Sequence, residues 1–340
     1  MICHRRILLV LMALPLAACG GDSRLPELQL SGDALGTRYN ITLIAPPAEL
    51  HKEQLSERIV NTLQRIDELA STWRDDSQLS LFNANPSTGW INVSAELCSA
   101  IESSLEISRL SNGAFDITVG PLVNLWGFGP DGVLNEPPEQ EAVDAALQDV
   151  GYEQLQADCK RPALHKQRPG LYVDLSGWAK GLAVDEVALL LKRSGLENYM
   201  VEIGGELTVS GFNAERKNWA IAIETPSTIM RQPHSVLRLT NTSVATSGDY
   251  RNYFEHNGIR YSHTIDARTG RPVSHRLAAV TVVDQSAAWA DAMATALLVL
   301  GPEAGPALAE NLGVAGYFLV RESSGFEELA TSNFEKLRNL

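Results

Sequence analysis

One carboxylate and one hydroxyl lie four residues apart in an apolar, helix-favouring segment. Asp291 and Thr295 belong to the run W-A-D-A-M-A-T-A-L-L-V-L, residues 289–300. In a helix this spacing places both oxygens on one face, one turn apart. The segment alone favours the simpler interpretation, that Asp291 caps the helix or lies in its first turn. The alternative is a site for a hard cation such as Mg²⁺, which binds few carboxylates together with neutral oxygens and phosphates.

A second segment combines a strand, a tight turn and the start of a helix. Residues 173–181 read V-D-L-S-G-W-A-K-G. Free backbone N–H groups at such a helix start attract an anion, and Lys180 could reach a phosphate there. Asp174 could hold a cation or a polar ring, or it could simply cap the helix that follows.

Single ionisable residues also lie in two turn-like segments. Asp116 lies within G-A-F-D-I-T-V-G, residues 113–120, where it could equally satisfy the backbone amides of a turn. His263 lies in S-H-T-I-D, residues 262–266, after a strand and before a Thr-Gly turn. A histidine in this setting is either a hydrogen-bonded hairpin residue or a proton-transfer group. Residues 245–251, A-T-S-G-D-Y-R, offer small hydroxyls that we interpret as a turn.

The elements that must position these residues alternate between helical and strand patterns. Apolar spacing predicts helices at 51–70, 94–109, 139–149, 178–193, 287–300 and 303–312. Strands are predicted at 27–44 with a break at Gly32 and Gly36, and at 172–175, 200–203, 206–209, 219–224, 236–239, 277–283 and 316–320. Asn257-Gly258 predicts a hairpin over 250–264. Antiparallel hairpins mixed with helices indicate an α+β fold, and no composition break divides residues 26–340.

The first residues predict export from the cytoplasm. A basic start, an apolar run over 7–14 and the ending L-A-A-C fit a signal peptide of residues 1–18. The ending also resembles a bacterial lipobox, in which Cys19 would carry the lipid and residues 19–25 would form a tether. The alternative is an ordinary signal peptide followed by an incidental cysteine. We expect a body attached to a membrane surface by a lipid anchor.

Charge and cysteine content exclude several classes of protein. The 340 residues contain 28 Lys and Arg against 41 Asp and Glu, a formal net charge of −13, with no basic run for a nucleic-acid partner. This acidic balance suits a protein that meets anionic substrates through a bound cation. No Cys or His spacing is typical of a zinc site. An exported protein could pair Cys98 with Cys159, but their separation in sequence does not show whether they are close.

Several motifs occur in a fixed order along most of the chain. They are G-T-R-Y, S-T-W-R-D-D-S, D-I-T-V-G-P-L-V-N-L-W-G-F-G, D-L-S-G-W-A-K-G, I-G-G-E-L, A-T-S-G-D-Y-R, S-H-T-I-D and A-D-A-M-A-T-A-L-L-V-L-G. In this order, from about residue 36 to residue 301, the sequence resembles the ApbE family of FAD:protein FMN transferases. The resemblance implies an ApbE-like mixed fold with antiparallel sheets flanked by helices. It also implies a periplasmic lipoprotein that splits FAD and attaches FMN to a threonine, or a serine, of a target protein.

The resemblance also implies roles for individual residues. Mg²⁺ would be bound by Asp291 and Thr295 with the carbonyls of Gly177 and Ala294. Flavin contacts map onto Leu35, Trp73, Ala114, Phe115, Asp116, Asp174, Lys180 and Ile265. Trp73 stands where many relatives carry tyrosine, and its indole keeps a large stacking surface. With these roles carried over, the cation interpretation of Asp291 replaces the capping one.

The implied reaction is a magnesium-assisted phosphoryl transfer that releases AMP. His263 is the candidate for removing the proton of the acceptor hydroxyl or orienting it, and Asp266 for orienting His263. The implied acceptors are subunits of membrane redox complexes that face the periplasm, and the family favours the inner membrane. Two alternatives are an FAD pyrophosphatase that releases FMN and AMP, and a non-catalytic FAD-binding protein. The glycine pattern at 127–132 does not indicate a Rossmann fold, because no strand precedes it and it contains Pro130.

Overall fold

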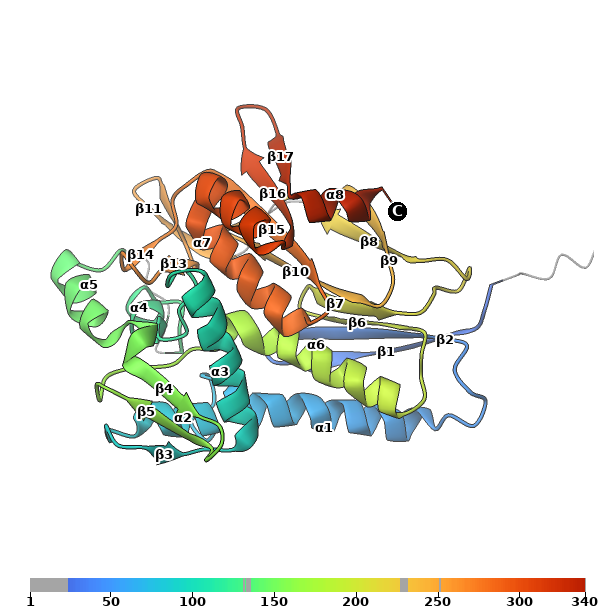
Figure 1. Ribbon diagram of the computed structural model, residues 1–340, viewed down its shortest axis with the longest axis horizontal. Coiled ribbons are helices and arrows are strands. Elements are labelled where there is room, and N and C mark those ends of the chain that lie inside the picture. Colours follow the sequence, from blue (N-terminus) through green and yellow to red (C-terminus); the bar gives the residue numbers. More distant parts are fainter. Residues whose placement is uncertain (1–23, 131, 133–135, 227–231, 251, 340) are drawn as a thin grey trace, which may run out of the picture.

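An eight-stranded antiparallel sheet forms the centre of the fold (Figure 1). The computed structural model describes residues 24–130, 132, 136–226, 232–250 and 252–339. The predicted signal peptide and Cys19 therefore lie outside the described residues. The strand order is β1 (Glu27–Ala34), β2 (Thr37–Ile44), β6 (Tyr199–Ile203), β7 (Glu206–Ser210), β10 (Thr242–Gly248), β15 (Leu277–Asp284), β16 (Ala315–Arg321) and β17 (Phe326–Ala330).

Helices and four small sheets surround this central sheet. The helices are α1 (Lys52–Ala70), α2 (Gln78–Ala84), α3 (Ala95–Leu110), α4 (Gly120–Leu125), α5 (Gln140–Ala146), α6 (Ser176–Arg193), α7 (Ala287–Leu312) and α8 (Ser332–Arg338). The small sheets are β3 (Ile91–Asn92), β5 (Ala163–Lys166) and β4 (Leu155–Asp158); β8 (Trp219–Glu224) and β9 (Pro233–Leu239); β11 (Tyr253–His256) and β12 (Ile259–Ser262); and β13 (Ile265–Asp266) and β14 (Arg271–Pro272). The predicted α+β class is confirmed.

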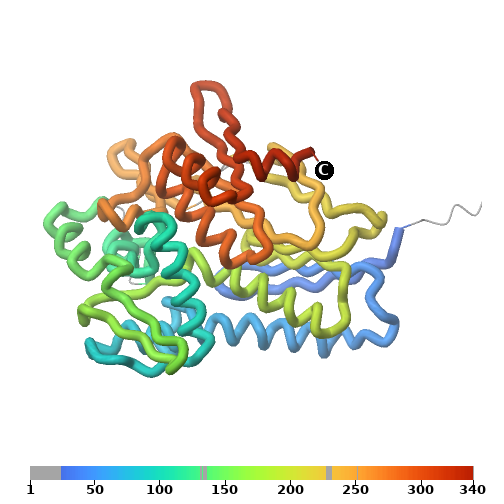
Figure 2. Tube along the Cα trace, in the orientation of Figure 1, coloured from blue at the N-terminus to red at the C-terminus, as the bar shows by residue number. Residues whose placement is uncertain are grey.

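The central sheet buries both of its faces, as the alternation along β16 shows. Phe318 and Val320 pack with α3 and α7, whereas Tyr317 and Leu319 pack with the β8–β9 pair and α8. Side chains of successive strand residues point to opposite faces, so one short strand serves two cores. At the other end of the sheet, α1 and α6 cover β1, β2 and β6. Figure 2 follows the chain through these layers.

Helix α7 is two helices joined at a break, as the two separate predictions for 287–300 and 303–312 require. Gly301 has φ 81° and ψ −173°, a conformation outside the helical region, and Pro302 follows it. By length and apolar composition α7 could cross a membrane. Its apolar residues instead pack against β15 and α3 in the main core, and Asp291 lies among them.

Helices α6 and α7 cross at very close range at Gly181 of α6. A Cβ atom on Gly181 would lie 2.3 Å from the carbonyl oxygen of Ala287. Asp185, one turn further along α6, accepts hydrogen bonds from the backbone N–H groups of Ala287, at 2.8 Å, and Ala288, at 3.1 Å. Ser286 is the N-cap residue of α7. The interpretation of Asp291 as the cap is therefore wrong, because Ser286 and Asp185 perform that role.

Three local predictions differ from the structure. The break expected at Gly32 is absent, because Gly32 lies inside β1 and is paired with Tyr39 of β2. Residues 172–175 form no strand, because only an isolated bridge joins Tyr172 to Val119. Instead, the Asn83 side chain pairs with both backbone groups of Val173 at 2.8 Å. Residues 245–248, predicted as a turn, belong to β10 in the middle of the sheet. Their small side chains suit a strand over which α7 lies closely.

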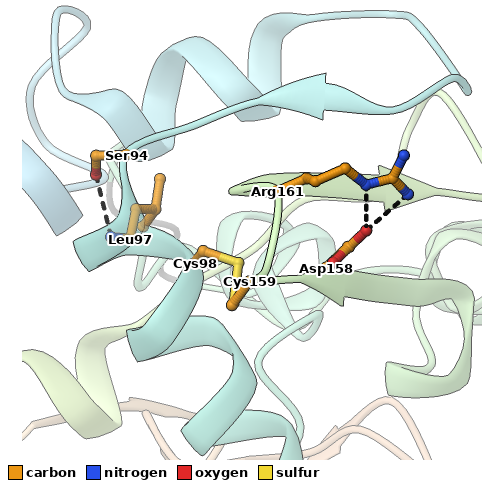
Figure 3. Close-up of a disulfide and its surroundings, with 6 residues drawn as sticks. All are labelled: Ser94, Leu97, Cys98, Asp158, Cys159 and Arg161. Carbon is orange, nitrogen blue, oxygen red and sulfur yellow. Dashed lines mark hydrogen bonds and ion pairs between the residues drawn. A yellow bond between two sulfur atoms is a disulfide. The ribbon is translucent and has the colours of Figure 1, made fainter.

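A disulfide joins α3 to the connection between β4 and β5 (Figure 3). Cys98 and Cys159 are bonded, with Cα atoms 5.6 Å apart. Ser94 caps α3 by accepting a hydrogen bond from the Leu97 N–H at 3.1 Å, which fixes the helix turn that carries Cys98. Beside Cys159, Arg161 donates two hydrogen bonds to Asp158. The bond therefore links two locally ordered turns.

Replacing Cys98 and Cys159 together by serine should lower the free energy of unfolding by about 4 kcal/mol, because the bond closes a loop of 61 residues in the unfolded chain. Urea denaturation of the oxidised protein and of the double variant measures this difference. Reductant should lower the midpoint of the parent protein and leave that of the variant unchanged. An unchanged midpoint in the variant would show that the bond contributes nothing to stability.

Candidate active site

A cavity of about 1090 Å³ opens where α6 and α7 cross the ends of several sheet strands. Its wall contains most of the candidate residues that the sequence indicates. They are Trp73, Ala114, Phe115, Asp116, Asp174, Gly177, Lys180, His263, Ile265, Asp291 and Thr295. The chain thus brings together residues from its N-terminal, central and C-terminal parts.

Three predicted residues lie outside the described lining of this cavity. Leu35 occupies the turn between β1 and β2 with φ 53° and packs against the core beneath α1 and α6. Ala294 is completely buried within α7. Asp266 accepts hydrogen bonds from Arg268 in the turn after β13, at 2.8 and 2.9 Å. Burial of the Ala294 side chain leaves only its backbone groups for a ligand, Leu35 is partly buried, and the Asp266 carboxylate is engaged by Arg268.

The centre of the site is a buried group of charges. Asp291 is 2% exposed, and its Oδ2 lies 3.2 Å from Lys180 Nζ and 3.3 Å from the backbone nitrogen of Gly181. Lys180 Nζ also lies 3.5 Å from Oε1 of Glu206, at the start of β7. An ammonium ion and an N–H donor thus offset the cost of burying the Asp291 carboxylate inside an apolar helix pair.

The neighbouring charges shift the pKa values within this group. Burial alone would lower the pKa of the Lys180 ammonium, but the Asp291 and Glu206 carboxylates raise it above its ordinary value. Burial raises the pKa of the Glu206 carboxyl, and Lys180 only partly opposes that shift. Lys180 therefore stays charged at neutral pH. This buried group contains one fixed cation and two carboxyl groups.

Oxygen atoms next to this group give it the donors that a hard cation binds. Thr295 Oγ1 lies 2.8 Å from Ser247 Oγ of β10. Gly177 lies in the first turn of α6 next to this hydroxyl, since a Cβ atom on it would lie 3.5 Å from Thr295 Oγ1. Among the described residues, no three His, Cys, Asp or Glu side chains form a metal cluster. One carboxylate with hydroxyl and carbonyl oxygens fits Mg²⁺, which completes its shell with water and substrate phosphates.

His263 enters the cavity wall from the base of the β11–β12 hairpin. Its Nδ1 donates to the carbonyl oxygen of Asn252 at 3.0 Å, since a carbonyl can only accept. The neutral ring is therefore unprotonated at Nε2. Burial lowers the pKa of His263, and the Lys180 charge adds to this effect. The imidazole is thus neutral at physiological pH and can accept a proton.

The apolar part of the wall offers surfaces for a planar ring. The indole of Trp73 is 69% exposed, while Phe115 is buried. The Phe115 ring lies against Gly177, where a Cβ atom would be only 3.1 Å from it. An exposed indole and a buried phenyl ring are surfaces on which an aromatic ligand can pack. The cavity therefore combines ring-binding and charge-binding regions.

The two other aspartates of the wall are held by backbone groups. Asp116 accepts hydrogen bonds from the N–H groups of Thr118 at 2.8 Å and Tyr152 at 2.9 Å, as its interpretation as a turn residue requires. Asp174 accepts from the N–H of Ser176 at 2.7 Å, at the start of α6. Both carboxylates fix the local chain while they face the cavity.

Replacing Asp116 by asparagine should lower the free energy of unfolding by about 1 to 3 kcal/mol, because one of the two buried N–H donors would lose its acceptor. Thermal or urea denaturation measures the loss. Replacing Glu335 of α8 by glutamine is the control; its half-exposed side chain makes only a surface ion pair with Arg338, so stability should change by less than about 0.5 kcal/mol. Equal stability of the Asp116 variant and the parent would contradict this assignment.

The sequence patterns assign no role to Glu206, although it is the second carboxyl group of the site. The residue lies in the segment I-G-G-E-L, which by itself predicts only a hairpin. Gly204 and Gly205 have φ 66° and 113°, conformations that favour glycine and turn the chain so that Glu206 begins β7 inside the cavity wall. The two consecutive glycines before Glu206 are the sequence feature from which its position in the site could have been predicted. The contact of the Ser247 hydroxyl with the site was not predicted for a different reason. Its strand, β10, has the amino-acid composition of a turn.

Several known proteins are similar to this chain in sequence or in fold over nearly their full lengths. The FAD:protein FMN transferase of Vibrio cholerae serotype O1 is 42% identical over 327 residues, 96% of this chain and 97% of that protein. That of Escherichia coli K12 is 38% identical and covers 90% of this chain and 88% of its own length. The solved structure of the flavin transferase ApbE from Vibrio cholerae has a TM-score of 0.86 and 41% identity, and covers 92% of this chain and 99% of its own.

A second solved structure, the apo form of the flavinyl transferase ApbE from Pseudomonas stutzeri, has a TM-score of 0.85 and 39% identity, with 93% and 98% coverage. The fold is thus that of flavin transferases. Residues 35–318 match the ApbE family, and the chain belongs to that family. It is an enzyme, an FAD:protein FMN transferase with FAD as its substrate.

Proposed function

We propose that this enzyme uses Mg²⁺ to cleave the diphosphate of FAD, attaches FMN through a phosphoester bond to a threonine or serine hydroxyl of a target protein, and releases AMP. The observation that carries the proposal is the buried Asp291 carboxylate beside Lys180 in the cavity wall. Phosphoryl transfer depends on positioned groups and neutralised charge, and this part of the cavity supplies both.

Asp291 and Thr295 are the side chains that would hold the metal, with carbonyl oxygens of Gly177 and Ala294 as further ligands. A bound Mg²⁺ would neutralise charge on the diphosphate and make AMP a better leaving group. Lys180, at the first turns of α6, would bind a phosphate oxygen, where the N-terminus of the helix also favours negative charge. Of these residues, Gly177, Lys180, Asp291 and Thr295 line one cavity.

The remaining residues of the wall would orient the two substrates. Trp73 and Phe115 offer ring surfaces for flavin or adenine, next to Ala114, Asp116, Asp174 and Ile265. The neutral His263 would accept the proton of the acceptor hydroxyl at Nε2, because Asn252 fixes the proton at Nδ1. Asp266 is bound to Arg268 and would act only through the position of the loop it stabilises.

The cellular setting is proposed from the sequence. Residues 1–18 would be removed as a signal peptide, Cys19 would carry a lipid, and residues 26–340 would form the catalytic body on the periplasmic side of the inner membrane. The acceptors would be periplasm-facing subunits of membrane redox complexes. The disulfide between Cys98 and Cys159 supports this setting, because such bonds persist in oxidising compartments.

Replacing Asp291 by asparagine should reduce FMN transfer at least about a thousandfold, equivalent to about 4 kcal/mol of lost transition-state stabilisation. The assay incubates the mature protein with FAD, Mg²⁺ and a threonine-bearing acceptor domain, and mass spectrometry detects the FMN adduct. Glu335→Gln is the control. It also removes a carboxylate, but from α8, which lies on the opposite side of the central sheet. Unchanged transfer by the Asp291 variant would refute the metal role, and AMP release without an adduct in the parent would indicate hydrolysis instead.

The pH dependence of kcat/KM should report His263. Because its pKa is lowered, the ring is neutral above the ordinary histidine pKa of about 6.5 and becomes protonated only at lower pH. We expect activity to be constant from about pH 6.5 upwards and to fall below that value. His263→Ala should slow transfer about a hundredfold or more and remove this acidic limb. A variant with the parent's rate and the same acidic limb would exclude His263 from the mechanism.

A further inference from the structure

Lys180 is shared between two buried carboxyl groups. The Asp291 side chain is 3% exposed and the Glu206 side chain 5%, whereas the Lys180 side chain is 31% exposed. Oε1 of Glu206 faces the ammonium ion, but Oε2 is buried and has no hydrogen-bond partner among the described residues. The group therefore has one cation for two carboxyl groups and one oxygen that is available for a further contact.

The ammonium ion and a metal at Asp291 would compete for the same carboxylate. Lys180 Nζ lies 3.2 Å from Oδ2 of Asp291, a distance at which a divalent cation bound to that carboxylate would repel it. A competing cation weakens metal binding unless it has another favourable position. Glu206 offers that position, because its unpartnered oxygen lies in the same cavity wall.

A glycine lies beside the aliphatic part of the Lys180 side chain. Gly204 precedes β7, and a Cβ atom there would lie 3.3 Å from Lys180 Cδ and 3.0 Å from Thr37 Cγ2. A larger residue at this position would confine the aliphatic part of Lys180. The absence of a side chain at Gly204 therefore leaves the aliphatic part of Lys180 less crowded on this side.

We propose that Glu206 is a positioning residue that draws Lys180 away from Asp291 when a divalent cation binds there. The proposal rests on the Mg²⁺ site of the proposed function. In the metal-free protein Lys180 contacts both carboxyl groups. In the metal-bound protein it pairs with Glu206, and its ammonium remains in the cavity to face a phosphate. Glu206 acts through Lys180 and contacts neither the metal nor the reacting atoms.

The test measures Mg²⁺ binding to the mature protein without FAD, by isothermal titration calorimetry. Lys180→Met removes the competing cation and should tighten binding about tenfold, a difference of about 1.4 kcal/mol. Glu206→Gln leaves Lys180 with Asp291 alone and should weaken binding about tenfold. In the Lys180→Met protein the same glutamine substitution should change affinity by less than about twofold, because the residue that transmits its effect is absent.

Glu202→Gln is the matched control, because Glu202 lines the same cavity but bonds to Asn40 at 2.7 Å and to the Gly205 N–H at 2.8 Å. Removing this charge weakens cation binding only through the general field of the site. We expect a smaller effect than that of Glu206→Gln, and the same effect with or without Lys180. The Lys180→Met protein should also transfer FMN more slowly while it binds Mg²⁺ more tightly, a combination that general loss of structure would not produce.

The proposal is overturned if Lys180→Met weakens Mg²⁺ binding or leaves it unchanged, or if Glu206→Gln has equal effects with and without Lys180. If Glu206→Gln does not fold, the affinity of Lys180→Met alone decides between these outcomes. Asp291→Asn separates this test from that of the proposed function. Mg²⁺ binding that survives the loss of Asp291 would refute the metal site itself, whereas binding that requires Asp291 but ignores Lys180 would refute only the role of Glu206.

Discussion

A carboxylate buried at the crossing of two helices is the constraint on which the site depends. Asp291 lies within the apolar core and would be costly there without a nearby cation and hydrogen-bond donors. Lys180 and the Gly181 N–H meet this requirement because α6 passes directly over α7. The close crossing in turn requires a glycine at position 181, because the Cβ atom of any other residue there would collide with the backbone of α7. Charge and packing thus specify the same geometry.

The rest of the fold brings complementary groups to this crossing. Strand β7 begins beneath it with Glu206, β10 ends beneath it with Ser247, and the β11–β12 hairpin contributes His263 at its base. Asp185 and Ser286 satisfy the first turn of α7, so the carboxylate of Asp291 is left for the cavity. These residues come from distant parts of the chain, so the site depends on the tertiary fold that brings them together.

The sequence predicts the helices and strands of the site better than the contacts between them. The helix over 287–300, the break after it and the shared face of Asp291 and Thr295 all follow from local periodicity and glycine. The contact with Lys180 does not, because it joins residues 111 positions apart and depends on how two helices cross. The prediction of a turn at 245–248 is wrong because small hydroxyl residues, which are typical of turns, are favoured here by packing beneath α7 within β10. The pairing of Cys98 with Cys159 likewise requires the fold.

The most direct test of this account is the position of a divalent cation in a crystal of the mature protein soaked with Mn²⁺ and an uncleavable FAD analogue. The account predicts an anomalous scattering peak at a coordination distance of about 2.1 Å from an Asp291 oxygen, in contact with the diphosphate. Lys180 should then lie against Glu206. A cation bound elsewhere, with Lys180 still paired to Asp291 beneath an ordered diphosphate, would contradict it.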